Sequence, residues 1–200
     1  MAMEDHAIIP GKGFVLVGPV DTKVPDLGAV NLNDADTFTG WQWLGHTSRE
    51  NAVALSKEGG EASTLGSWEV PDLRQEFSSA TWSMTVNALN VTKETLALAM
   101  PNGTWDEETK SHAFGGNLGS SAKAVLVVME DNKNGRAAIY FPNGAISLGE
   151  APSISAESFF EIQLSVAGQG SPKTGHTMQW FTPRAVSTPL PSAEASGAGD

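Results

Sequence analysis

The chain has 200 residues, of which 40% are hydrophobic, and 12 basic against 23 acidic residues give it a formal net charge of −11. That length and apolar content fit one folded domain with a sizeable core. The absence of cysteine excludes disulfides and thiolate metal sites, and the scattered Lys and Arg exclude a grip on DNA that works by neutralising clustered phosphates.

The first part of the chain is predicted to be extended and rich in loops. Residues 1–12 contain Pro10 and lack the pattern of a secretory signal, so we expect an N-terminal arm on a protein made in a cytoplasm. Residues 13–19 form a short apolar strand that glycine and proline end. Residues 21–36 are predicted to be a loop, and strand-like spacing resumes over residues 38–44.

A β-hairpin is predicted around a pair of glycines. Extended runs over residues 51–57 and 62–70 flank Gly59 and Gly60. Paired glycines supply the positive φ angles that a tight hairpin turn demands. The polar tip of this hairpin consists of Lys57, Glu58, Gly59, Gly60 and Glu61.

Two later segments alternate between apolar and polar residues with a period of two, which is typical of strands with one buried face. The first covers residues 79–88, with Trp82 and Met84 on the apolar side. The second covers residues 155–166, with Phe159 as its one misfit. Their polar faces contain Ser79, Thr81, Ser83, Thr85 and Asn87 in the first, and Glu157, Glu161 and Gln163 in the second.

One helix is predicted over residues 92–100, because Thr92 is suited to the N-cap position and Pro101 follows the last turn. Residues 104–121 are expected to be an irregular, glycine-rich loop. Residues 123–129 and 137–141 are apolar on both faces and are joined by a turn at Asn134 and Gly135. A last short strand is predicted over residues 176–182.

These elements predict a mainly β fold: an antiparallel β-sandwich or barrel with one flanking α-helix, long loops and flexible termini. The predicted organisation is an N-terminal arm (1–12), a single β domain (13–186) and a flexible polar tail (187–200).

No arrangement typical of catalysis or of a cofactor site is found in the sequence. The four histidines lie in four different segments, a GxSxG elbow and phosphate-binding loops are absent, and the acidic residues are too scattered to nominate a pair. We therefore predict no enzyme activity, no metal and no cofactor. Membrane association is not expected either, since no apolar run reaches 18 residues.

Six tryptophans against one tyrosine are the most unusual feature of the composition. We expect five of them in the core or in a subunit interface: Trp41, Trp43, Trp68, Trp82 and Trp180. Trp105 lies in the irregular loop and is the candidate for an exposed platform.

Three short patterns together carry a family resemblance. They are Gly45-His46-Thr47-Ser48, Glu58-Gly59-Gly60-Glu61 and Leu65-Gly66-Ser67-Trp68. With them the chain resembles the major tail proteins, or tail tube proteins, of long-tailed bacteriophages with non-contractile tails, above all those of phages that infect actinobacteria. The likeness is strongest over residues 41–103.

The resemblance implies a structural protein of the virion tail that forms stacked, hexameric rings around a channel for DNA. The implied partners are further copies of the chain and the tape measure, tail terminator and distal tail proteins, while DNA passes without specific binding. The hairpin at Lys57–Glu61 becomes the candidate for ring stacking, and the polar faces of the two alternating strands become candidates for the channel wall. The acidic charge then has two open interpretations: solubility, or a wall that repels DNA.

Two other functions remain open at this point. A carbohydrate-binding β-sandwich, such as a phage appendage or decoration domain, predicts an exposed Trp105 or Trp41. A small hydrolase predicts a cleft in which a histidine and an acid converge. At the level of the fold, the resemblance extends to the tube proteins of type VI secretion, so a contractile injection device is a further alternative.

Overall fold

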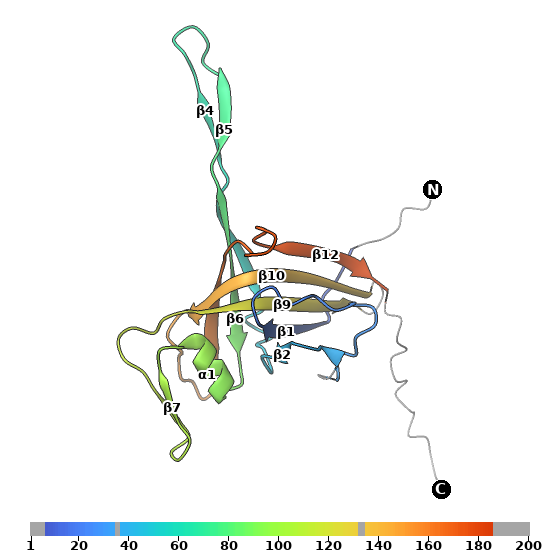
Figure 1. The fold of residues 1–200 in the computed structure, drawn as a ribbon, viewed down its shortest axis with the longest axis vertical. Coiled ribbons are helices and arrows are strands. Elements are labelled where there is room, and N and C mark those ends of the chain that lie inside the picture. The colour runs from blue at the N-terminus through green and yellow to red at the C-terminus, as the bar shows by residue number, and fades with distance from the viewer. Residues whose placement is uncertain (1–6, 35–36, 132–134, 186–200) are drawn as a thin grey trace.

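One antiparallel sheet of eight strands organises the protein in the computed structural model, which describes residues 7–34, 37–131 and 135–185 (Figure 1). In spatial order its strands are β2 (Gln42–Trp43), β1 (Lys12–Gly18), β9 (Ser121–Asp131), β10 (Gly135–Leu148), β11 (Ile162–Gly168), β6 (Ala80–Ala88) and β3 (Ala54–Gly59), and β12 (Gln179–Arg184) also pairs with β10. Within the described residues the end strands β2 and β3 do not pair, so the sheet does not close into a barrel. The prediction of a mainly β, antiparallel fold with one flanking helix is confirmed.

A bulge in the middle of β10 lets this strand change its neighbour along one edge. Before the bulge one edge of β10 pairs with β12, and after it the same edge pairs with β11. On the opposite edge the register against β9 shifts between Phe141 and Gly144. Pro142 lies in this shift, where its missing N–H costs no ladder bond. A bulged strand bends, so the two halves of β10 serve two differently oriented parts of the sheet.

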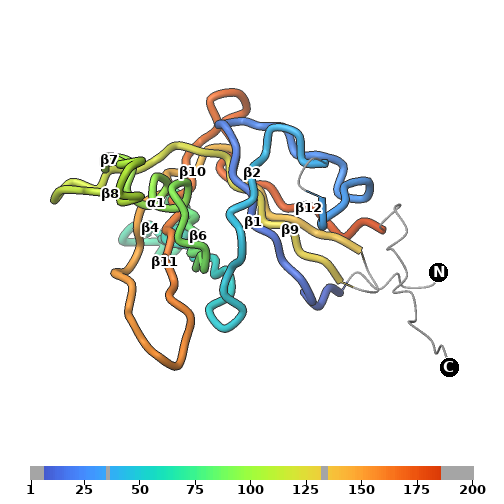
Figure 2. The backbone as a smooth tube through the Cα atoms, turned by 90° about the horizontal axis from the view of Figure 1, so that it is seen from below, coloured from blue at the N-terminus to red at the C-terminus, as the bar shows by residue number. Residues whose placement is uncertain are grey.

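Two hydrophobic clusters lie on opposite faces of the sheet. The first gathers Met84, Val86, Leu164 and Val166 beneath the helix α1 (Lys93–Ala99). The second lies on the other face, where residues 19–41 fold over β1, β9 and the first half of β10. Figure 2 shows these residues as the blue loops beside β1 and β2. The sequence predicted only a loop over residues 21–36, but Leu27 and Val30 in that loop are core residues.

The predicted helix is confirmed to within a residue at each end. The Oγ1 atom of Thr92 accepts a hydrogen bond from the backbone N–H of Thr95 at 3.3 Å, as an N-cap does. Leu98 and Ala99 are buried against the sheet, and Met100 closes the last turn by donating to the carbonyl of Leu96 at 2.8 Å. α1 therefore caps one end of the first cluster.

Three predicted elements are wrong in part. Strand spacing over residues 38–44 yields only the two-residue strand β2. Residues 104–121 contain a short hairpin of β7 (Thr104–Asp106) and β8 (Ser111–Ala113) rather than an irregular loop. The second alternating strand begins at Ile162 instead of residue 155, because its partner β6 ends at Ala88 and leaves the earlier residues without a ladder. The turn at Asn134 and the tail 187–200 lie outside the described residues.

A buried ion pair ties the loop over residues 19–41 to the sheet. Arg136 on β10 and Glu130 on β9 face each other in the ladder, and the Nε atom of Arg136 donates to Oε2 of Glu130 at 2.7 Å. The side chains are 3% and 9% exposed. The guanidinium also donates to the backbone carbonyls of Leu27 and Val30. One cation thus satisfies a carboxylate and two loop carbonyls that water cannot reach.

Replacing Arg136 with methionine is expected to lower the free energy of unfolding by about 3–5 kcal/mol, since it leaves a buried carboxylate without its partner. Urea unfolding followed by tryptophan fluorescence measures this change. The matched control is Arg74→Met, which removes an exposed ion pair to Glu76 and should change stability by less than about 1 kcal/mol. A similar loss for both variants would contradict the role assigned to Arg136.

Candidate assembly surfaces

A long two-stranded ribbon, residues 60–79, projects from the sheet (Figure 1). We call it the arm; it is distinct from the N-terminal arm predicted over residues 1–12. It contains β4 (Ala62–Leu65) and β5 (Arg74–Phe77), which pair with each other, and it continues the pairing of β3 with β6. The last pair at the sheet is Gly59 with Ala80, and the first pair in the arm is Ala62 with Phe77. Two residues on each side separate these pairs, so the ladder keeps its register. Every residue from 61 to 80 is exposed.

This arrangement corrects the predicted hairpin at Lys57, Glu58, Gly59, Gly60 and Glu61. Gly59 and Gly60 have φ values of +73° and +72°, as expected, but they do not turn the chain. They sit where the ribbon leaves the sheet, and the N–H groups of Gly60 and Glu61 both donate to Oγ of Ser78 at 3.0 and 3.2 Å. A Cβ on Gly59 would lie 2.4 Å from the carbonyl oxygen of Ser79. The two glycines therefore lie at the junction of the sheet and the arm, not at the arm's tip.

The tip of the arm is the loop over residues 66–73. Ser67 holds it closed, because its N–H donates to the carbonyl of Val70 at 2.7 Å and its Oγ accepts from the N–H of Val70 at 3.2 Å. Gly66 is needed there, since a Cβ would lie 2.1 Å from the carbonyl oxygen of Pro71. This turn leaves Trp68 fully exposed, at 103% of its reference area.

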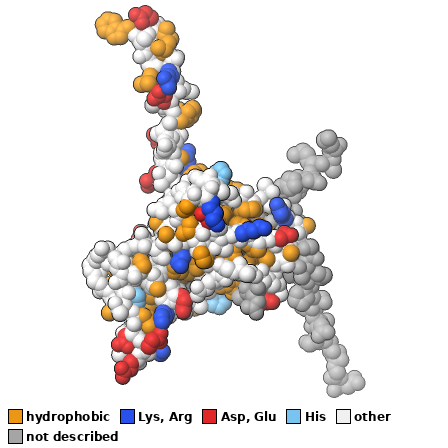
Figure 3. Space-filling view, in the orientation of Figure 1, with side chains coloured by type: hydrophobic (Ala, Val, Ile, Leu, Met, Phe, Trp, Pro, Cys, Tyr) orange, Lys and Arg blue, Asp and Glu red, His pale blue; other side chains and the backbone are white. Residues whose placement is uncertain are grey.

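Hydrophobic side chains are unusually frequent on the arm. Figure 3 shows them along the projection and at its end. The large exposed ones are Leu65, Trp68, Val70, Leu73 and Phe77. A two-stranded ribbon is marginally stable in water by itself, and an exposed apolar edge invites pairing with another chain. These properties are typical of a contact surface.

A second surface covers the side of the sheet opposite α1, over β3, β6, β11 and the second half of β10. We call it the polar face, and its members are Ala54, Ser56, Ser83, Thr85, Ala145, Ser147, Ser165 and Ala167. The ladder aligns them in rows, with Thr85 beside Ser165 and Ser165 beside Ser147. They alternate with core residues such as Met84 and Leu164, so they share one side. All are small, uncharged and at least partly exposed.

The channel-wall candidates of the sequence do not all belong to this face. Thr81, Ser83 and Thr85 lie along β6, while Ser79 lies at the base of the arm and Glu157 in an exposed loop. The remaining three candidates are Asn87, Gln163 and Glu161, and their side chains form hydrogen bonds with neighbouring loops. Asn87 is 8% exposed and donates to the carbonyl of Asn51 at 3.2 Å, the side chain of Gln163 accepts from the N–H of Glu150 at 2.8 Å, and Glu161 accepts from Oγ of Ser48 at 2.6 Å. The alternating pattern of one strand could not reveal the contributions of β3 and β10.

The tryptophans divide into packed and exposed groups. Trp41 is 8% exposed and packs edge-on to Tyr140, Trp43 packs against Phe14, and Trp82 borders the first cluster. Trp68 and Trp180 are 103% and 60% exposed, so neither is a core residue of this chain. An interface role for those two stays a prediction.

The alternative of a sugar-binding platform needs an open ring at Trp105 or Trp41. Trp41 is buried, and its Nε1 donates to the carbonyl of Lys23 at 3.1 Å. Trp105 is half-buried beside His112, with the ammonium of Lys93 at 5.8 Å from the ring centre. Neither residue presents the free flat face that stacking on a sugar requires, so no observation favours this alternative.

The β7–β8 hairpin carries a compact group of charges. Glu107 accepts hydrogen bonds from the ammonium groups of Lys93 and Lys110, and these lower the pKa of Glu107 to about 2. Backbone N–H groups of Thr109 and Glu108 lower the pKa of Asp106. Both carboxylates therefore stay ionised well into the acid range, and the hairpin keeps its charge pattern.

The described residues bring no group of three or more His, Cys, Asp or Glu into a position to hold a metal ion. His46, His112 and His176 lie on separate elements, and His6 lies outside the described part of the chain. Among the same residues, no helix has both the length and the apolar content to cross a membrane. The outstanding features are thus two surfaces, one apolar and projecting, the other polar and flat.

Comparison with known proteins relates the chain to proteins of phage tails. A family model described as "Phage tail tube protein" matches residues 1–192. The chain is 33% identical over 141 residues to the major tail protein Gp23 of Mycobacterium phage D29, an alignment that spans 66% of this chain and 69% of the relative. It is 34% identical over 139 residues to the major tail protein Gp23 of Mycobacterium phage L5, again spanning 66% and 69%.

Proposed function

The chain belongs to the phage tail tube protein family and is a structural component of the virion tail, and we propose that its copies assemble into stacked hexameric rings whose channel conducts the phage genome during ejection. The arm is the single observation that carries this proposal. Its exposed apolar residues and its unsupported ribbon become stable once a neighbouring copy covers them.

The polar face fits the wall of a channel for DNA. Its serine, threonine and alanine side chains offer no cation that could hold a phosphate. The acidic composition adds to this effect, because six copies at −11 each give a ring of formal charge −66. A polymer of the same sign is repelled by a ring of that charge and slides through without binding. The chain's further partners in the tail would be the tape measure, tail terminator and distal tail proteins that the family resemblance implies.

Electron microscopy of the purified chain at rising concentration, together with sedimentation, tests the proposal. We expect rings and hollow tubes above a threshold concentration. Fragments of sheared tubes added as seeds should remove any lag, since they supply the ring that an initiating complex would otherwise provide. A chain that stays monomeric at all concentrations and fails to extend the seeds would contradict self-assembly.

A further inference from the structure

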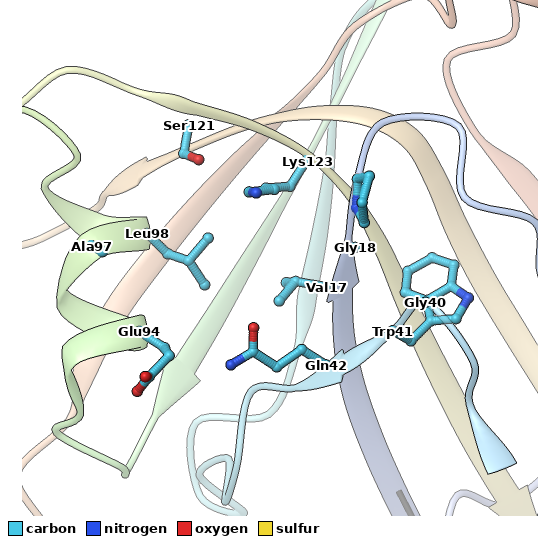
Figure 4. A pocket seen from close by; sticks show the side chains of 11 residues that line it. Val17, Gly18, Gly40, Trp41, Gln42, Glu94, Ala97, Leu98, Ser121 and Lys123 are labelled. Atoms are coloured by element: carbon cyan, nitrogen blue, oxygen red, sulfur yellow. The ribbon is translucent and has the colours of Figure 1, made fainter. Parts of the chain in front are cut away.

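A pocket at the opposite edge of the sheet from the arm has the shape and chemistry to receive the arm's tip. Its volume is about 460 Å³, and it opens between α1, the end of β1 and the short strand β2 (Figure 4). Val17, Trp41 and Leu98 form its apolar walls. Volumes of 300–1,000 Å³ with mostly apolar walls are typical of built binding sites.

One cation gives the pocket a preferred partner. Lys123 lines it and points into it in Figure 4, and it forms no ion pair with any other described residue. Glu94 lies on a different wall, contributed by α1. The tip of the arm carries the acids Glu69 and Asp72 beside Trp68. A large apolar side chain with acids next to it complements the apolar part of this pocket and its unpaired lysine, on the side away from Glu94.

Topology decides which molecule can supply that side chain. The arm leaves the sheet at β3 and β6, whereas the pocket lies at β1 and β2, the other end of the strand order. The arm also points away from the body (Figure 1), and its limb over residues 60–65, six residues at roughly 3.3 Å each, places the tip about 20 Å beyond the sheet and away from its own pocket. A contact between opposite edges of identical chains is heterologous, and such contacts generate rings or open helical assemblies.

We propose that Trp68 of one subunit inserts into the pocket between α1 and β1–β2 of a neighbouring subunit, with Asp72 paired to Lys123 of that neighbour. This inference rests on the proposed self-assembly, and it assigns the site on one subunit that receives the arm of the next. The indole supplies 150–250 Å² of surface that becomes buried, as the anchor residues of protein interfaces do. Leu65 and Leu73 then cover the rim of the pocket.

Disulfide trapping tests the contact cleanly, because the chain contains no cysteine. Chains with Glu69→Cys are mixed with chains with Ala97→Cys, an exposed residue at the pocket, and the assembled mixture is oxidised. We expect a covalent dimer as the main product. The matched control replaces Ala97→Cys with Thr174→Cys, which lines a second pocket of about 360 Å³ near Tyr140 and should give at least tenfold less dimer.

The outcomes separate the inference from the function on which it rests. Tubes that form but give no more dimer with Ala97→Cys than with Thr174→Cys would overturn the assigned pocket and leave self-assembly intact. A chain that forms no assembly, even from seeds, would contradict the proposed function and the pocket together.

Charge reversal supplies a second readout that needs no crosslink. We expect Lys123→Glu to raise the threshold concentration for assembly about tenfold, and Lys173→Glu, at the second pocket, to leave it unchanged. Adding Asp72→Lys to Lys123→Glu should restore the threshold of the unsubstituted chain. Equal effects of the two lysine reversals, or no recovery in the double variant, would overturn the pairing of Asp72 with Lys123.

Discussion

Removing residues 61–78 is expected to leave a folded monomer that no longer forms tubes. In this variant Gly60 joins Ser79, and the two become a two-residue turn that closes the last ladder pair, Gly59 with Ala80. The body loses no packing, because the deleted residues are all exposed. Sedimentation should find monomers at concentrations at least about 100-fold above the normal threshold, since losing the burial of two large apolar side chains costs about 3 kcal/mol.

Thermal unfolding provides the control for this truncation. The melting temperature should stay within a few degrees, and a large drop would mean that the arm supports the body and that the lost assembly has another cause. A full-length variant with Ser63→Ala and Gln75→Ala keeps every large apolar residue of the arm and should assemble normally. Tubes formed by the truncated chain would contradict the role of the arm.

The elements that the sequence predicted well are those whose pattern is local and complete. β6 follows from an alternation without error over residues 79–88, and α1 follows from Thr92 as a cap and Pro101 as a stop. β9 and the first half of β10 follow from runs that are apolar on both faces, because both clusters bury them. In each case the residues that specify the element lie inside it.

The arm shows where such patterns fail. A Gly-Gly pair allows a tight turn, but it also allows a twist in a continuous ribbon, and only the partner strand decides between them. Here β3 pairs with β6 and β4 with β5, so the turn lies farther along the chain. The glycine and proline at positions 66 and 71 were a second turn signal in the same segment. Together with pairing to residues 79–88, they indicate the correct hairpin.

The polar face was predictable only in part for a related reason. Each strand shows which of its residues lie on one side, but the sequence does not show which strands become neighbours. Ser56 and Ser147 join Ser83 on this face only through the register of β3, β11 and β10. The pocket at Lys123 is still less accessible, because its walls come from four separate elements.

Lysines introduced on the polar face are expected to leave tubes intact and to hinder the passage of DNA. The variant combines Ser83→Lys and Ser147→Lys, whose strands are separated by β11, so the two cations are not direct ladder neighbours. If the face lines the channel, each hexameric ring gains 12 cations, from two per chain. The phosphates of DNA then bind the wall. Binding of this kind depends strongly on salt: a protein that contacts six to ten phosphates loses roughly 10³–10⁵-fold in DNA affinity between low and moderate salt.

Phage particles that carry this variant should have tails of normal appearance and an infectious titre at least about 100-fold lower, with ejection in vitro recovering as salt is raised, because salt weakens phosphate contacts. Ser83→Asn with Ser147→Asn controls for side-chain size, and Gln169→Lys with Thr174→Lys controls for added charge on exposed residues outside the face. Both controls should keep a normal titre. Normal ejection through tubes that contain the lysine variant would show that the polar face does not line the channel, and the outer surface of the tube would then be the place for it.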